Sequence, residues 1–135
     1  MLEVLGQLTA VVAEDAHIMS RLLRAYLMTY NCHVVAEISA GDRVIAAIEQ
    51  HKPNIVFLDI NLPKRNGLDV LHEIKTRWPD LFTVMFSAHN TVDNVQKSVN
   101  WGADGFIVKP FSTIKVKEAI DNYIARQAPA KCISE

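Results

Sequence analysis

Five short apolar runs alternate along the chain with five longer stretches in which apolar residues recur at helical spacing. The apolar runs predict strands at residues 8–13, 33–38, 55–58, 82–86 and 105–108. The stretches between and after them predict helices at residues 17–30, 43–51, 68–78, 91–102 and from 112 or 113 to about 126. A strand–helix unit repeated five times predicts an α/β fold with a parallel sheet, helices on both faces and right-handed crossovers.

The apolar residues of each helical stretch mark a candidate apolar face. In the first helix they are Ile18, Leu22, Ala25 and Met28. In the later helices they are Val44, Ile45 and Ile48, then Leu68, Leu71 and Ile74, then Val92, Val95 and Val99, and last Val116, Ala119, Ile120, Tyr123 and Ile124. Asn31 and Gly102 are typical helix-ending residues, and Thr91 can cap the fourth helix.

Charged or hydroxyl side chains that could take part in chemistry follow the first, third, fourth and fifth predicted strands. Glu14 and Asp15 follow the first, Asp59 the third, Ser87 the fourth and Lys109 the fifth. The carboxyl ends of parallel strands lie at one edge of the sheet, where open α/β sheets place their ligands. Three carboxylates, a hydroxyl and an ammonium group are therefore expected to converge there, around the acid in the stretch PNIVFLDINLPKRNG.

Composition narrows the classes of protein to be considered. The chain has 135 residues, of which 50% are hydrophobic and 21% charged, as in one ordinary globular domain. We expect that domain to span residues 1–126 and to be followed by a short tail, 127–135. A net charge of −1 gives no electrostatic basis for direct nucleic-acid binding. The apolar runs are too short to insert in a membrane, and the start of the chain lacks the pattern of a secretory signal.

The cysteines and histidines lack metal-site spacing. Cys32 and Cys132 are far apart and form no CxxC motif, so a disulfide framework or a zinc site is not expected, and the cytoplasm is the expected location. The five histidines form no HxH or HxxxH pair, which argues against a transition-metal site.

Carboxylates that converge at one edge repel one another unless a cation offsets their charge. Lys109 supplies one positive charge, and a hard divalent ion such as Mg²⁺ prefers the oxygen ligands that carboxylates offer. A carboxylate can also be a nucleophile that forms an aspartyl phosphate. The pattern therefore predicts phosphoryl transfer to Asp59, with Ser87 and Lys109 binding the phosphoryl oxygens.

These motifs give residues 8–126 a resemblance to the receiver domain of two-component response regulators. The matching features are Glu14-Asp15, the segment LDINLPKRNG around Asp59, Ser87-Ala88 and the segment GFIVKPF around Lys109. Each alone is weak, but the four together in this order are highly specific. The resemblance implies a flavodoxin-like, doubly wound sheet of five strands in the order 2-1-3-4-5. Glu at 14, Ser at 87 and Phe at 106 are mild departures from the residues usual in the family.

The resemblance also implies roles at the acceptor. Asp59 would be phosphorylated by a histidine kinase, a phosphotransfer protein or a small phosphodonor. Asp15, Asp59 and the backbone carbonyl of Asn61 would be direct ligands of Mg²⁺ or Mn²⁺, with Glu14 acting through water. Asn61 and His89, each two residues beyond a site residue, would tune dephosphorylation, although a solvated loop histidine is an equal alternative for His89.

A further set of residues is implied to report phosphorylation. Ser87 would turn toward the phosphate, and Phe106 would swing inward with it, without the hydroxyl that a tyrosine would bring. Lys109 would pair with the phosphate, and the peptide bond before Pro110 would be cis. The fourth helix, the fifth strand and the fifth helix would then form the protein-binding surface that is switched.

Several functions remain open. The favoured one is a stand-alone, chemotaxis-like switch that is monomeric or weakly dimeric when phosphorylated, with no enzyme activity beyond its own phosphorylation and dephosphorylation. A phosphorelay intermediate and the receiver part of a longer regulator are alternatives. An aspartyl-phosphate phosphatase would need a second acid at position 61, where this chain has Asn61. A flavodoxin-like cofactor binder would need a phosphate-binding loop where Glu14 and Asp15 would repel phosphate.

Overall fold

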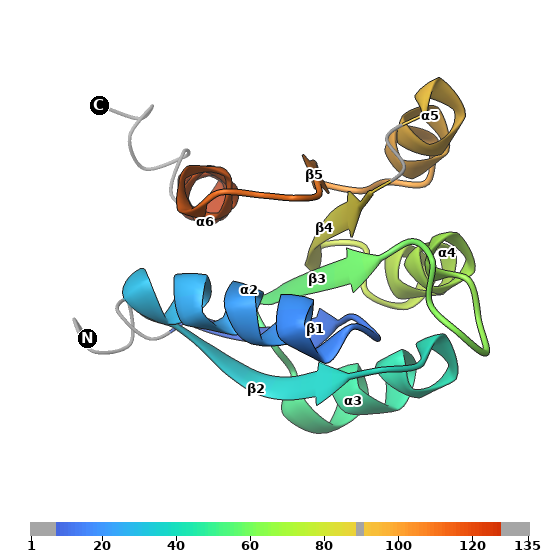
Figure 1. The fold of residues 1–135 in the computed structure, drawn as a ribbon. Coiled ribbons are helices and arrows are strands. Elements are labelled where there is room, and N and C mark those ends of the chain that lie inside the picture. The colour runs from blue at the N-terminus through green and yellow to red at the C-terminus, as the bar shows by residue number, and fades with distance from the viewer. Residues whose placement is uncertain (1–7, 89–90, 128–135) are drawn as a thin grey trace, which may run out of the picture.

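A computed structural model describes residues 8–88 and 91–127 of the chain (Figure 1). The five strands form one parallel sheet in the order β2-β1-β3-β4-β5, which confirms the predicted topology. They are β1 (Leu8–Ala13), β2 (Cys32–Ile38), β3 (Ile55–Asp59), β4 (Phe82–Ser87) and β5 (Gly105–Val108). Asp59 and Ser87 are thus the last residues of their strands, and the sheet itself fixes their backbones.

The helices cover both faces of the sheet, as a doubly wound fold requires (Figure 1). They are α2 (His17–Thr29), α3 (Val44–His51), α4 (Gly67–Arg77), α5 (Val92–Asn100) and α6 (Thr113–Gln127), with a short 3₁₀ turn, η1 (Gly41–Arg43), before α3. One hydrophobic cluster joins α2 and α6 to one face of the sheet, and a second joins α3 and α4 to the other. No helix in the described part of the chain is long and apolar enough to cross a membrane.

Strand β3 lies at the centre of the sheet and supplies both clusters. Successive side chains of a strand point to opposite faces, and accordingly Phe57 lies in the α2–α6 cluster while Leu58 lies in the α3–α4 cluster. All five residues of β3 are buried, Asp59 included. A strand buried on both faces has an uninterrupted apolar sequence, which is why the run before Asp59 does not alternate.

The predicted apolar face of α2 is wrong. Ile18, Leu22 and Met28 are exposed, whereas Leu23 and Leu27 enter the α2–α6 cluster. Apolar residues lie on two sides of this helix. The side that is buried also brings Tyr26 and Tyr30 against the α2–α6 cluster. The exposed residues therefore form a second apolar stripe on the outer surface of α2.

Other helix faces were predicted with mixed success. Leu68, Leu71 and Ile74 of α4 are buried as predicted, but Ile124 of α6 is exposed. Helix α5 buries Ser98 alone among its residues, all of which are described, so its valines are not an inward face. Val92 is 84% exposed, and α5 is consequently held by little apolar burial.

The helix ends follow local hydrogen-bonding chemistry. The Asn66 side chain accepts a hydrogen bond from the N–H of Leu68 at 2.8 Å, and the Thr91 hydroxyl accepts one from the N–H of Asn94 at 3.1 Å. Asn31 and Gly102 end α2 and α5 with φ of 62° and 94°, as their residue types predicted. The cap on α4 matters most here, because α4 begins beside Asp59.

We predict that two adjacent leucines of α2 differ sharply in their effect on stability. Leu23→Ala should lower the free energy of unfolding by about 2–5 kcal/mol, because Leu23 is 1% exposed and its loss leaves a cavity. Leu22→Ala, at a position 37% exposed, should change it by less than about 1 kcal/mol. Urea unfolding of both variants measures the difference. Equal decreases in the free energy of unfolding would contradict the burial of Leu23 and the exposure of Leu22.

Candidate functional site

The strand register brings the polar strand ends together. Ala13 pairs with Leu58, and Asp59 pairs with Phe86, so Glu14 follows its strand at the level of Asp59. Ser87, the last residue of β4, pairs with Val108, the last residue of β5. Lys109 follows Val108 and therefore lies at the same edge of the sheet. The convergence predicted from the order of the strands is therefore what the structure shows.

Glu14 is held in place by its backbone and its side chain. Its N–H donates to the carbonyl of Ile38 at 2.9 Å, and Oε2 of its carboxylate accepts from the N–H of Ala16 at 3.0 Å. The residue is only 3% exposed. Its other oxygen, Oε1, is thereby directed to the Lys109 ammonium group, which it contacts.

Asp59 is fixed through both of its carboxylate oxygens. Oδ1 accepts a hydrogen bond from the N–H of Asn61 at 3.2 Å, and Oδ2 accepts one from Nζ of Lys109 at 3.0 Å. The residue is 4% exposed. A carboxylate bonded at both oxygens has little freedom to rotate, so its orientation is set before any ligand arrives.

Gly67 allows the loop after Asp59 to return against the end of β3. Its N–H donates to the carbonyl of Ile60 at 2.7 Å, and a Cβ atom at this position would lie 2.0 Å from the backbone oxygen of Asp59. Since that oxygen belongs to a central strand, it cannot move away. Glycine is thus required here for α4 to begin beside Asp59.

Lys109 lies between the two buried carboxylates. Its N–H donates to the carbonyl of Ser87 at 2.9 Å, and its ammonium group contacts Glu14 and Asp59. Nζ also lies 5.0 Å from the centroid of the Phe86 ring. The following peptide bond, to Pro110, is cis as expected.

Burial and the ion pairs with Lys109 shift the pKa values of the buried charged residues in opposite directions. Burial raises the pKa of Glu14 above its usual value, although hydrogen bonds from Lys109 and Ala16 lower it. For Lys109, burial lowers the pKa, but the carboxylates of Glu14 and Asp59 more than offset this, so the pKa lies above its usual range. The ion pair with Lys109 alone would lower the pKa of Glu14. Burial and the nearby charge of Asp59 outweigh it, so the net shift is upward.

Three acids at this edge could hold a metal ion. Glu14, Asp15 and Asp59 each offer a carboxylate oxygen, and these oxygens lie within 4.8 Å of one another. Asp15 is exposed, so the cluster is open to solvent on that side. An all-oxygen donor set of this kind fits a hard divalent cation such as Mg²⁺ or Mn²⁺.

The predicted switch residues lie on neighbouring strands. Ser87 is fully buried at the end of β4. Phe106 is half-buried on β5, pairs with Met85 and packs against the α3–α4 cluster. Asn61 is exposed at the start of the loop after Asp59, whereas His89 lies outside the described residues.

Some features of the site had not been predicted. The contact between Glu14 and Lys109, the packing of Lys109 over Phe86 and the close approach at Gly67 all depend on side-chain reach or on loop path. Of these, Gly67 alone carried a signal, since a glycine ends the turn-rich stretch after Asp59.

Comparison with known proteins gives consistent matches. Residues 10–121 match the family described as response regulator receiver domain. The chain is 32% identical to the chemotaxis protein CheY of Listeria monocytogenes over 84% of this chain and 96% of that protein. It is 27% identical to the regulatory protein LuxO of Vibrio vulnificus over 89% of this chain, but spans only 26% of that protein. The CheX-CheY-BeF₃-Mg²⁺ complex from Borrelia burgdorferi superposes with a TM-score of 0.80 at 23% identity, over 84% of this chain and 86% of that one.

We predict that Lys109→Met destabilises the protein in the absence of divalent ions. The substitution leaves Glu14 and Asp59 buried without their cation, which should cost on the order of 3 kcal/mol in the free energy of unfolding. Addition of Mg²⁺ should recover part of that loss, because the ion restores positive charge between the carboxylates. Chemical denaturation with and without Mg²⁺ measures both effects.

Lys117→Met is the matched control for that measurement. Lys117 pairs with Asp121 on the exposed surface of α6, so its loss should change stability by less than about 1 kcal/mol, with no response to Mg²⁺. Equal destabilisation of the two variants would show that Lys109 does not neutralise a buried acidic pair.

Proposed function

This chain belongs to the response regulator receiver domain family, and from that premise we propose that it is a switch phosphorylated on Asp59. The observation that carries the proposal is a buried strand-end carboxylate bonded to Lys109, with two further acids close enough to share a metal ion. The proposed phosphodonor is a histidine kinase or a histidine phosphotransfer protein.

In the proposed reaction an oxygen of Asp59 attacks the phosphorus of a phosphohistidine. An oxygen–phosphorus bond forms, the phosphorus–nitrogen bond breaks, and its electron pair stays on the donor imidazole. The product is an acyl phosphate on Asp59. Lys109 and the Ser87 hydroxyl would bind the phosphoryl oxygens as charge builds on them, and Lys109 already lies 3.0 Å from the acceptor carboxylate.

The acidic cluster supports a requirement for Mg²⁺, or Mn²⁺ in its place. Asp15, Asp59 and the carbonyl of Asn61 would be the direct protein ligands, with Glu14 holding a bound water. When bound, the ion would supply positive charge beside the phosphoryl oxygens. Mg²⁺ is named in the CheX-CheY-BeF₃-Mg²⁺ complex that resembles this chain.

The exposed stripe on α2 supports docking of the phosphodonor beside Asp59. Helix α2 begins two residues after Asp15, so Ile18 and Leu22 lie near the acceptor edge of the sheet. A partner bound there would bring its phosphohistidine toward Asp59 without crossing the molecule. Contiguous exposed apolar residues of this kind are typical of protein interaction sites.

A second exposed apolar surface supports an output role for α5, β5 and α6. Val92, Val99, Val108 and Ile114 are exposed on these elements. Because α5 buries Ser98 alone, few apolar contacts hold it, and phosphorylation could bias its position through Ser87 and Phe106. A downstream protein would then distinguish the two states. Self-association would be limited to a weak dimer of the phosphorylated form.

The two kinds of relative support two different contexts for this domain, a stand-alone protein and one part of a longer regulator. Coverage of 96% of CheY supports a stand-alone switch, whereas the 26% of LuxO that matches supports a receiver within a longer regulator. A relay intermediate would use the same site. We propose no enzyme activity beyond self-phosphorylation and autodephosphorylation, whose rate Asn61 and His89 would tune. A cytoplasmic location stays a prediction.

Phosphorylation of Asp59 has a direct test. Incubation with acetyl phosphate and Mg²⁺ should add one phosphoryl group, and Asp59→Asn should abolish that labelling because an amide is no nucleophile for phosphorus here. Intact-mass spectrometry measures the labelled fraction. Asp69→Asn, an exposed acid in the first turn of α4, is the control that should label fully. Undiminished labelling of Asp59→Asn would refute the assignment.

The switch residues can be separated from the acceptor by Ser87→Ala. We expect this variant to accept phosphate but to lose the phosphorylation-dependent changes in the amide resonances of Phe106 and Val108, because the hydroxyl that would turn toward the phosphate is absent. Two-dimensional ¹H–¹⁵N NMR of the wild type and the variant, each with acetyl phosphate and Mg²⁺, makes the comparison. Identical changes in both proteins would remove Ser87 from the switch.

A further inference from the structure

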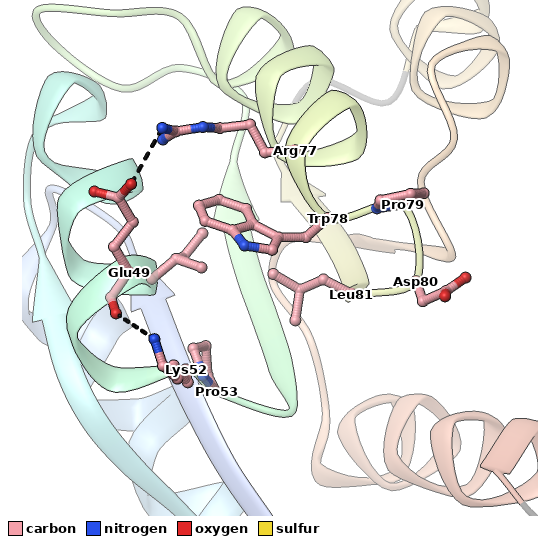
Figure 2. Close-up of a pocket in the computed structure, with 9 residues that line it drawn as sticks. Glu49, Lys52, Pro53, Arg77, Trp78, Pro79, Asp80 and Leu81 are labelled. Atoms are coloured by element: carbon pink, nitrogen blue, oxygen red, sulfur yellow. Dashed lines mark hydrogen bonds and ion pairs between the residues drawn. The ribbon is translucent and has the colours of Figure 1, made fainter.

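An open pocket of about 800 Å³ lies at the edge of the sheet opposite Asp59. Its walls come from the ends of α3 and α4 and from the segments that lead into β3 and β4 (Figure 2). Both helices run against the strands, so their last residues lie at the amino edge of the sheet. The volume falls within the range of small-molecule sites.

The walls combine a flat aromatic side chain with aliphatic and proline surface. The Trp78 ring points toward the α3 side of the pocket, where Pro53 lies, and Leu81 lies beside the ring (Figure 2). Ile48 also lines the pocket. Trp78 also packs against the edge of the α3–α4 cluster, which keeps its ring in place. The Arg77 guanidinium lies 5.2 Å from the centroid of the Trp78 ring. The remaining aromatic and aliphatic surface suits a planar hydrophobic group.

Most polar groups around the pocket are already bonded. Glu49 and Arg77 form an ion pair at 3.1 Å across its rim (Figure 2). On the loop side, Nζ of Lys75 donates to the carbonyls of Pro79 and Leu81, at 3.4 and 2.6 Å. The Glu49 carboxylate and the carbonyls of Pro79 and Leu81 thus already have partners within the protein.

Two hydrogen-bond donors of the pocket lining reach solvent. Trp78 is half-buried and Lys52 is exposed, and within residues 8–88 and 91–127 neither forms an ion pair or a hydrogen bond with a carboxylate. Nζ of Lys52 makes one long bond, of 3.3 Å, to the carbonyl of Glu49. The remaining acid, Asp80, points away from the space between the walls (Figure 2). These donors, which have no carboxylate of the protein as a partner, favour a negatively charged acceptor in the pocket.

We propose that this pocket binds a small organic anion with a planar apolar body, such as an aromatic carboxylate. The apolar body would lie against Trp78, Pro53 and Leu81, and the carboxylate would accept hydrogen bonds from the Trp78 indole and the Lys52 ammonium group. The site is separate from Asp59 and needs no phosphorylation.

The probes for a test are 2-naphthoate and its neutral analogue of the same shape, 2-naphthamide, titrated into the unphosphorylated full chain. Two-dimensional ¹H–¹⁵N NMR resolves the indole N–H resonances, and Trp101→Phe assigns them. Naphthoate should shift the Trp78 resonance saturably, with a dissociation constant of about 1 mM for a ligand of this size, and leave Trp101 unmoved. Naphthamide should bind about fivefold more weakly, as loss of one exposed charge interaction implies.

Lys52→Gln should weaken naphthoate binding about fivefold and remove the preference over naphthamide. Lys64→Gln is the matched control, since Lys64 is also a lysine of positive φ, at 73° against 47° for Lys52, but lies in the loop after Asp59. It should bind both probes as the wild type does. Absence of a saturable Trp78 shift, equal affinity for the two probes, or unchanged naphthoate affinity in Lys52→Gln would each overturn the proposal.

Discussion

The contact of one lysine with two buried carboxylates is the constraint on which the site depends. Lys109 can reach both Glu14 and Asp59 because β1, β3, β4 and β5 end at matching levels of one parallel sheet. Each of these strands contributes to the apolar clusters, so a shift in register would expose core residues as well as separate the charges. Stability and the geometry around Asp59 are therefore fixed by the same packing.

That arrangement also determines how much negative charge the surroundings of Asp59 would have to offset under the proposed function. Two carboxylates with one lysine carry a net negative charge, and a phosphoryl group would add to it. Lys109 cannot offset all of this, which is a physical reason for a metal ion at Glu14, Asp15 and Asp59. On phosphorylation Lys109 would have to divide its hydrogen bonds differently among Glu14 and the new oxygens. A rearrangement of β5, from which Lys109 extends, is then the expected path toward Phe106 and the exposed valines.

The fold class and the residues at the carboxyl edge of the sheet could be predicted because they follow from the alternation of strands and helices, while the spatial order of the strands came from the family resemblance. Asp59 and Lys109 follow strands of one parallel sheet that are separated only by β4, so both lie at its carboxyl edge. The phase of α2 could not be predicted in that way, since Leu22 and Leu23 both belong to plausible apolar stripes, and the choice depends on what packs opposite. Gly67 is similar: its closeness to the Asp59 carbonyl depends on the path of a loop.

The two edges of the sheet are joined by β3 and α4, but the packing argues against strong coupling between them. Gly67, at the start of α4, lies against Asp59, and Trp78, just past its end, lines the opposite pocket. To carry a signal, α4 would have to slide or tilt as a body. Leu71 and Ile74 are fully buried between those ends, and moving them would open a cavity in the α3–α4 cluster. Occupancy of the pocket should therefore leave Asp59 in place, which makes the pocket a second site and not an input to the first.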